Sequence, residues 1–237
     1  MLSENKFTGN LKYPGDFINK IIHGDCLELI KSIPDNSIDV VLTDPPYGLN
    51  KDGVRGDADL SLFYNILPEC DRVLKNDSFF ITFFSTKFLP QLFKNNPFKY
   101  FWQIVLYCPE GRVKSPIGYT KFMSCFIFKK GNPKIINRNK DIFVDTPGKM
   151  VEPDEGYIDH PTPKPKHFIK EILKMFTKEN DLILDPFIGS GSTAIACLQL
   201  NRRFIGFEVE KKYCSLAVNR IHKFLSILNL NAVRVEK

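Results

Sequence analysis

The 237-residue chain lacks the features that mark several classes of protein. Its N-terminus has no charged stretch followed by an apolar one, and no apolar run approaches the eighteen or so residues of a membrane span. The sequence also has no Cys-x-x-Cys pair, no low-complexity tract and no apparent internal repeat. We therefore expect a cytoplasmic protein that neither spans a membrane nor carries a metal site.

Cysteine is present but dispersed. The six cysteines are far apart in the sequence and stand mostly among apolar neighbours. This pattern is typical of small buried hydrophobic residues in a reducing compartment, rather than of zinc ligands or a disulfide set. The six residues are Cys26, Cys70, Cys108, Cys125, Cys197 and Cys214.

The positive charge is concentrated in one segment. Residues 111–149 hold nine Lys or Arg and two Asp, a net charge of +7, whereas the rest of the chain sums to −1. A basic segment in a neutral body predicts contact with a polyanion, and the alternative is a solvated loop. We expect a single domain over 1–237 with a small basic recognition insertion at 109–159. The candidate nucleic-acid contacts are Arg112, Lys114, Lys121, Lys134, Arg138 and Lys140.

Apolar periodicity predicts an α/β fold. Short β-branched or aromatic runs alternate with helical spacing, which favours a mostly parallel sheet with helices on both faces. The segment 121–130 is expected to be a strand, perhaps antiparallel to its neighbours, and the helix over 60–74 to be interrupted or bent at Pro68. The other expected strands are 20–24, 39–43, 78–84, 100–107, 181–185 and 203–207. The other expected helices are 26–33, 87–93, 166–176, 194–200 and 211–228.

The stretch Thr43-Asp44-Pro45-Pro46-Tyr47-Gly48 follows the apolar run 38–42 directly. Each proline pushes the preceding residue towards extended backbone and offers no N–H, so the turn is stiff. It presents one carboxylate, one free carbonyl and one aromatic ring at the carboxyl end of a strand, where open α/β sheets bind ligands. Two acceptors beside a stacking surface suit a planar group with an NH2, such as a nucleobase. The alternative is a stiff surface turn with an exposed tyrosine.

A second motif combines a strand, a glycine loop, a helix, another strand and an acid. Gly189 and Gly191 are expected to let the backbone approach a ligand, and Glu208, 23 residues after Asp185, to accept both ribose hydroxyls. The third glycine of the dinucleotide pattern is replaced by Ala194, and hydroxyl side chains fill the loop. The motif therefore predicts a nucleotide-containing ligand.

Four segments together resemble the S-adenosylmethionine-dependent DNA amino-methyltransferases of the β class. They are 44–47, 160–165, 185–193 and 206–213, in that order along the chain. The resemblance implies a circularly permuted, Rossmann-like methyltransferase fold, with a mostly parallel sheet of seven strands whose last hairpin is antiparallel. It also implies double-stranded DNA as the partner and a flipped-out adenine, methylated at N6, as the target.

The resemblance further implies roles for individual residues. Asp44, Pro45, Pro46 and Tyr47 form the catalytic motif, in which Asp44 and the Pro45 carbonyl accept the target amine and Tyr47 stacks on its ring. The cofactor-binding residues are Asp25, Thr162, Lys164, Asp185, Phe187, Gly189, Ser190, Gly191, Thr193 and Glu208. Pro163 stands where the family usually has Gln, which leaves the contribution of that side chain open.

Several alternatives stay open at this point. Asp rather than Ser at the first position of the catalytic motif favours adenine N6 over cytosine N4. An RNA or protein-glutamine amino-methyltransferase is a second hypothesis, and a cofactor-binding subunit without catalytic activity is a third. Because the insertion is small, we hypothesise a short target site, relaxed specificity, or a homodimer that shares the recognition of DNA.

Overall fold

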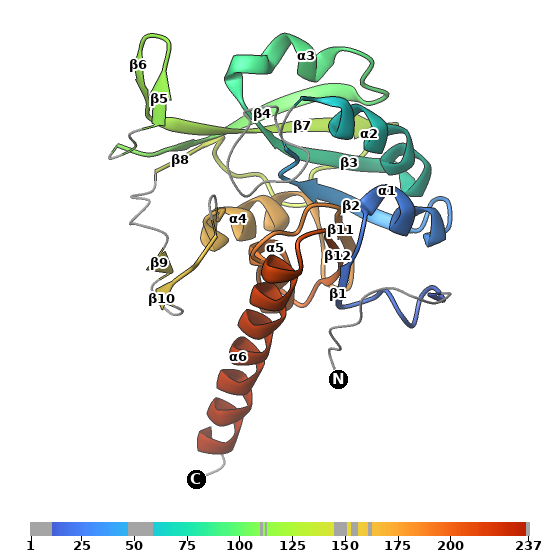
Figure 1. The fold of residues 1–237 in the computed structure, drawn as a ribbon, viewed down its shortest axis with the longest axis vertical. Coiled ribbons are helices and arrows are strands. Elements are labelled where there is room, and N and C mark those ends of the chain that lie inside the picture. The colour runs from blue at the N-terminus through green and yellow to red at the C-terminus, as the bar shows by residue number, and fades with distance from the viewer. Residues whose placement is uncertain are drawn as a thin grey trace.

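The computed structural model describes residues 11–46, 59–109, 111, 113–144, 151–152, 156–160 and 163–235. An eight-stranded sheet with helices on both faces organises them, in the strand order β1-β12-β11-β2-β3-β7-β4-β8 (Figure 1). The strands of this sheet are β1 (Lys20–His23), β2 (Ile38–Thr43), β3 (Leu74–Phe84), β4 (Lys99–Tyr107), β7 (Phe122–Lys130), β8 (Ile142–Val144), β11 (Leu182–Asp185) and β12 (Arg203–Glu208). The helices are α1 (Cys26–Leu29), α2 (Ser61–Val73), α3 (Leu89–Phe93), α4 (Lys166–Phe176), α5 (Ser192–Gln199) and α6 (Lys211–Val235).

The sheet is mostly parallel, as the sequence predicts. β1, β12, β11, β2 and β3 pair in parallel, and β7 runs antiparallel between β3 and β4. β11 and β12, which come late in the chain, lie between β1 and β2. This order agrees with the expected circular permutation and brings the glycine-loop motif beside the strand that leads to Asp44.

The strands are apolar because both faces of the sheet are covered. On β2, Val40 and Leu42 join the core under α4, α5 and α6, while Val41 joins the core under α1 and α2. Successive side chains on a strand point to opposite faces, so a doubly covered strand has no polar alternation. Burial of β2 on both sides fixes the direction in which it delivers the residues that follow Thr43.

The structure corrects three expectations. The sheet has eight strands instead of seven, because β8 adds a short parallel strand beyond β4. β8 has only three residues, of which Phe143 alone is buried, so its sequence carries too little pattern to predict a strand. The helix predicted over 26–33 is divided into α1 and a 3₁₀ turn at Ile30–Ser32. α2 continues through Pro68, which lies on its exposed side.

Two small hairpins lie outside the main sheet. One pairs β5 (Val113–Ser115) with β6 (Gly118–Thr120), and the other pairs β9 (Val151–Glu152) with β10 (Gly156–Tyr157). Figure 1 shows the first hairpin standing clear of the layers and α6 extending from the opposite side. Among the residues described, no helix has both the length and the apolar character that crossing a membrane requires.

Candidate active site

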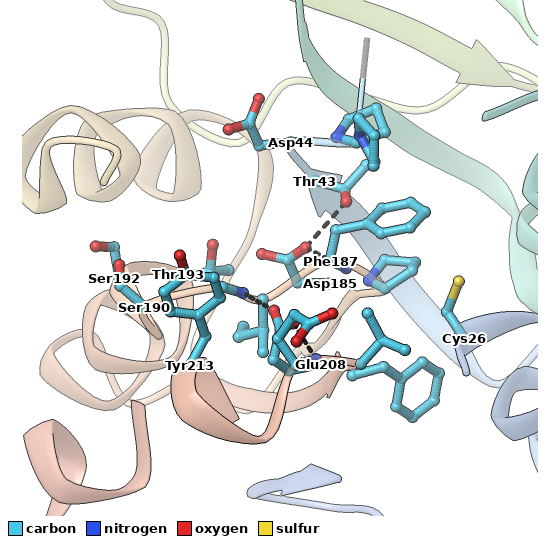
Figure 2. Close-up of a pocket in the computed structure, with 18 of the residues that line it drawn as sticks. Cys26, Thr43, Asp44, Asp185, Phe187, Ser190, Ser192, Thr193, Glu208 and Tyr213 are labelled. Carbon is cyan, nitrogen blue, oxygen red and sulfur yellow. Dashed lines mark hydrogen bonds between the residues drawn. The ribbon is translucent and has the colours of Figure 1, made fainter. Parts of the chain in front are cut away.

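A cavity of about 290 Å³ opens where β2, β11 and β12 end. Most of the site residues that the sequence predicts line it, although they come from segments more than a hundred residues apart. They are Asp25, Asp44, Pro45, Pro46, Lys164, Asp185, Phe187, Gly189, Ser190, Thr193 and Glu208. Gly191 does not line the cavity, and Tyr47 and Thr162 lie outside the described residues. Figure 2 shows Asp44 at one side of the cavity, Glu208 at the other, and Asp185 between them.

Asp44 lies at the end of β2 and forms an ion pair with Lys164. The two side chains are only 22% and 13% exposed, so the pair is shielded from solvent on most sides. The Lys164 ammonium also lies 5.3 Å from the centre of the Phe83 ring, at the end of β3. The sequence prediction assigned Lys164 to the cofactor, whereas the structure brings it against the carboxylate of the catalytic motif.

Asp185 ends β11 and is almost fully buried. The Thr43 hydroxyl donates to its Oδ1 over 2.9 Å and the Phe187 N–H over 3.1 Å, while Thr193 donates a further hydrogen bond. Burial nevertheless raises the pKa of Asp185 to about 7, because desolvation outweighs these donors. The carboxyl group joins the ends of β2 and β11 to the start of α5, so it holds the floor of the cavity together.

Glu208 ends β12 and turns its carboxylate towards the glycine loop. Its Oε2 accepts the Gly189 N–H over 3.0 Å, and its Oε1 accepts the Glu210 N–H over 2.8 Å. Burial raises the pKa of Glu208, and these two backbone donors oppose that rise. Among the described residues, no set of three His, Cys, Asp or Glu side chains is placed to hold a metal ion. Each carboxylate oxygen of Glu208 keeps a lone pair that can accept a hydroxyl group of a ligand.

Asp25 lines the cavity from the N-terminal end of α1. Its Oδ1 accepts the Leu27 N–H over 2.9 Å and thereby caps that helix. A carboxylate has several lone pairs, so a cap and a ligand contact are compatible. Helix capping alone would also explain an acid at this position, and the ligand role of Asp25 stays a prediction.

The glycine loop owes its glycines to packing against the protein. Gly191 has a φ of +82°, and a Cβ there would lie 2.9 Å from the Cβ of Ala217 on α6. Gly189 has a φ of +51°, and its Cβ would approach the Nε2 atom of His160 to 3.0 Å. L-residues with side chains rarely adopt such backbone. Close packing of the loop on α6 and His160 therefore requires glycine at both positions, and close approach of the backbone to a ligand stays a prediction.

Two residues of the site escaped sequence reasoning. His160 lines the cavity and packs edge-on against Tyr213, with 4.5 Å between the ring centres. Burial, and then the positive charge of Lys164, lowers the pKa of His160 to about 4, so the ring is neutral at pH 7. Arg220 is buried beneath the loop and donates from Nη1 to the Ser190 carbonyl. An arginine within the apolar stripe of α6 is the signal that could have revealed it.

The predicted nucleic-acid contacts that the structure describes come from two parts of the chain. Lys114 and Lys121 belong to the β5–β6 hairpin and its base, while residues 134–140 run along α4. Asn137, for example, donates from Nδ2 to the carbonyl of Lys174 on that helix. All five described members, Lys114, Lys121, Lys134, Arg138 and Lys140, are exposed, and Arg112 lies outside the described residues.

Comparison with known proteins agrees with this geometry. The family model for DNA methylases, N6_N4_Mtase, matches residues 38–219. DNA adenine methyltransferase YhdJ of Escherichia coli is 26% identical over 250 residues, covering 87% of this chain and 84% of that protein.

Among solved structures, the M1.HpyAVI–SAM complex has a TM-score of 0.65 at 24% identity and covers 85% of this chain and 98% of its own. The cytosine-N4-specific PvuII DNA methyltransferase has a TM-score of 0.71 at 21% identity, covering 88% of this chain and 90% of its own. At these identities the structural likeness establishes the fold, and the family match covers most of the chain. The chain therefore belongs to the N6/N4 family of DNA methylases.

Proposed function

We propose that this chain transfers a methyl group from S-adenosylmethionine to the exocyclic N6 amine of an adenine flipped out of double-stranded DNA. The observation that carries the proposal is that Asp44 and Glu208 open into one cavity. The Asp44 carboxylate suits an amine, the Glu208 carboxylate suits the hydroxyls of a ribose, and both line the same cavity. A nucleotide-binding protein without transfer chemistry would have no need for the first.

The lining of the cavity fits the cofactor. Glu208 offers carboxylate oxygens to ribose hydroxyls, Phe187 and Ile188 offer apolar surface to an adenine ring, and Ser190 and Thr193 add hydroxyls at the start of α5. Asp25 is a further acceptor on the same wall. When bound, S-adenosylmethionine supplies the methyl group as an electrophile attached to a sulfonium.

The residues at the end of β2 act on the target amine. Such an amine is a poor nucleophile because its lone pair is delocalised into the ring. Asp44 and the Pro45 carbonyl each accept one N–H, which turns the nitrogen so that its lone pair points into the cavity. Positive charge develops on that nitrogen during transfer, and the fixed carboxylate stabilises it. Tyr47, outside the described residues, is proposed to stack on the flipped base.

Lys164 shares this carboxylate before the target arrives. Its ammonium donates to Asp44, as the target amine is proposed to do. When the base binds, either the ammonium and the amine each donate to a different oxygen of Asp44, or Lys164 moves away. In both cases, the positive charge of Lys164 holds Asp44 in one orientation before the base binds. Orientation before binding lowers the cost of positioning the amine.

One residue is the reason for proposing adenine rather than cytosine as the target base. Asp44 stands at the position where the family resemblance associates Asp with adenine N6 and Ser with cytosine N4. YhdJ is named as an adenine enzyme, whereas the PvuII enzyme shares the fold and is named as cytosine-N4-specific. The choice of base rests on Asp44 alone, and cytosine N4 is the second candidate. A homodimer that shares DNA recognition stays a prediction.

Long-read sequencing of DNA from a host that expresses the chain tests the proposal, because it reports the base, the site and the stringency together. The matched control is the same host expressing the Asp44→Ala variant. We expect N6-methyladenine at a short site in the first host and at none of those positions in the second. Cytosine methylation at such a site would reassign the base, and equal signals in both hosts would contradict the role of Asp44.

A further inference from the structure

The β5–β6 hairpin projects from the edge of the sheet at which the cavity opens. β4 and β2 point the same way, since β2 is parallel to β3 and β7 is antiparallel to both β3 and β4. The hairpin starts just after β4, where the Cys108 N–H donates to the Lys121 carbonyl over 2.6 Å and closes its base. Figure 1 shows it extending well beyond that point. A ligand over the end of β2 is therefore approached from the side by this hairpin.

The hairpin buries almost nothing. Ile117, in its turn, is 99% exposed, and Tyr119 on β6 is 61% exposed. Full burial of an isoleucine side chain is worth about 1.5–3 kcal/mol, which this residue forgoes. An isolated two-stranded hairpin is also marginally stable in water. A partner that covers these exposed side chains would account for their position.

The charge of the hairpin selects the class of partner. Residues 111–122 contain Arg112, Lys114 and Lys121 and no acidic residue. Lys114 lies directly opposite Tyr119 in the ladder, so an ammonium and an aromatic ring share one face. A cationic face with an apolar tip is complementary to a duplex, whose phosphates are negative and whose interior is a stack of bases.

The dimensions agree with such a partner. Each strand of the hairpin has three residues, which extend about 10 Å, and the major groove of DNA is about 8.5 Å deep and admits a two-stranded ribbon. β2 and β4 are three strand spacings apart in the sheet, roughly 14 Å. At about 3.4 Å per base pair, a duplex with its target over Asp44 meets the hairpin within roughly four base pairs.

We propose that the β5–β6 hairpin lies in the major groove and that Ile117 presses into the base stack near the target as an apolar wedge. Ile117 and Pro116 form the two-residue turn, and neither side chain has a polar group that contact with bases would leave without a partner. Apolar wedges that enter from the minor groove unstack a base step at a cost of a few kcal/mol, which the contacts of the bent duplex offset, and we expect a similar cost for entry from the major groove. This inference rests on the proposed methyl transfer to DNA, for which it names the element that opens the duplex.

The test compares two duplexes that carry the target site. In one the target base is paired, and in the other it faces an abasic position, so it is already free to leave the stack. With wild-type protein both duplexes are methylated. We expect Ile117→Ala to lower the rate of methylation of the paired duplex at least tenfold, and that of the abasic duplex less than threefold. The control variant is Ile227→Ala, which truncates another exposed isoleucine, 39% exposed, on α6.

Each result has a distinct meaning. A loss confined to the paired duplex supports the wedge. Equal losses on both duplexes overturn it, because they show a contact that does not open the stack. Unchanged rates on both duplexes also overturn the wedge. The exposed hairpin would then be tested for contact between two copies of the chain by sedimentation. If the wild-type protein methylates neither duplex, the proposed function itself fails, independently of the hairpin.

Discussion

Removal of the Asp44 carboxylate should abolish methyl transfer while leaving the cofactor in place. Asp44 lies across the cavity from Glu208 and forms an ion pair with Lys164. Loss of one fixed group that stabilises developing charge typically lowers kcat by about 10²–10³. We expect a loss of at least this size for Asp44→Ala, with an unchanged dissociation constant for S-adenosylmethionine.

The same substitution affects stability through Lys164. With Asp44 removed, an ammonium that is only 13% exposed loses its counter-charge. A hydrogen bond between charged groups is worth about 1.5–3 kcal/mol, so the free energy of unfolding should fall by a figure of that order. The double variant Asp44→Ala, Lys164→Met removes both charges and should recover most of the stability but none of the activity.

Three measurements separate these effects: single-turnover transfer from labelled cofactor to DNA, calorimetry of cofactor binding, and urea unfolding. If Asp44→Ala retains more than a tenth of the wild-type rate, Asp44 is not the acceptor of the amine. If affinity for the cofactor falls in proportion to the rate, the carboxylate serves binding and the assignment is wrong. Recovery of activity in the double variant would point to Lys164 as an inhibitory cation instead.

Three further predictions concern the loop, the buried histidine and the DNA. Gly191→Ala should lower the free energy of unfolding by about 1–3 kcal/mol, because residue 191 has a φ of +82° and its new Cβ would meet Ala217. Adding Ala217→Gly to this variant should recover part of the lost stability, as measured by urea titration. The pKa of His160 is lowered from 6.5 to about 4, so neutral His160 contributes stability above pH 6.5 that is lost as the pH falls towards 4. His160→Phe should therefore reduce the dependence of the melting temperature on pH between 4 and 6.5, as measured by thermal unfolding. If the basic residues make about six phosphate contacts, a plot of the logarithm of the DNA association constant against the logarithm of salt concentration should have a slope of roughly −5. An association constant that does not change with salt concentration would exclude these residues as the DNA surface.

The sequence was sufficient for most strands of the sheet and for the three acids at the strand ends that line the cavity, for physical reasons. Buried parallel strands are continuous apolar runs, and a motif at the end of such a strand lies at the ligand edge whatever the order of the strands. Asp44, Asp185 and Glu208 each follow such a run, and all three line the cavity. The predicted burial of the six cysteines is confirmed for the same reason, since each stands among apolar neighbours.

The sequence was not sufficient for contacts between distant segments. Lys164 meets Asp44 across 120 positions of the chain, and no spacing encodes that pair. The short strand β8 depends on its pairing with β4 rather than on its own pattern. The path of residues 134–140 along α4, where Asn137 is anchored to Lys174, likewise depends on contacts that no local pattern encodes. Net charge along the sequence predicts a basic segment without predicting which elements carry it.

Identification of the modified nucleoside tests the central claim most directly. Unmethylated DNA is incubated with the purified chain and methyl-labelled S-adenosylmethionine, digested to nucleosides and analysed by mass spectrometry, with Asp44→Ala in parallel. The account predicts labelled N6-methyladenine with the wild-type protein and none with the variant. Labelled N4-methylcytosine would contradict the choice of base, and the absence of any labelled nucleoside, or label on a ring carbon, would contradict amine methylation by the Asp44 site.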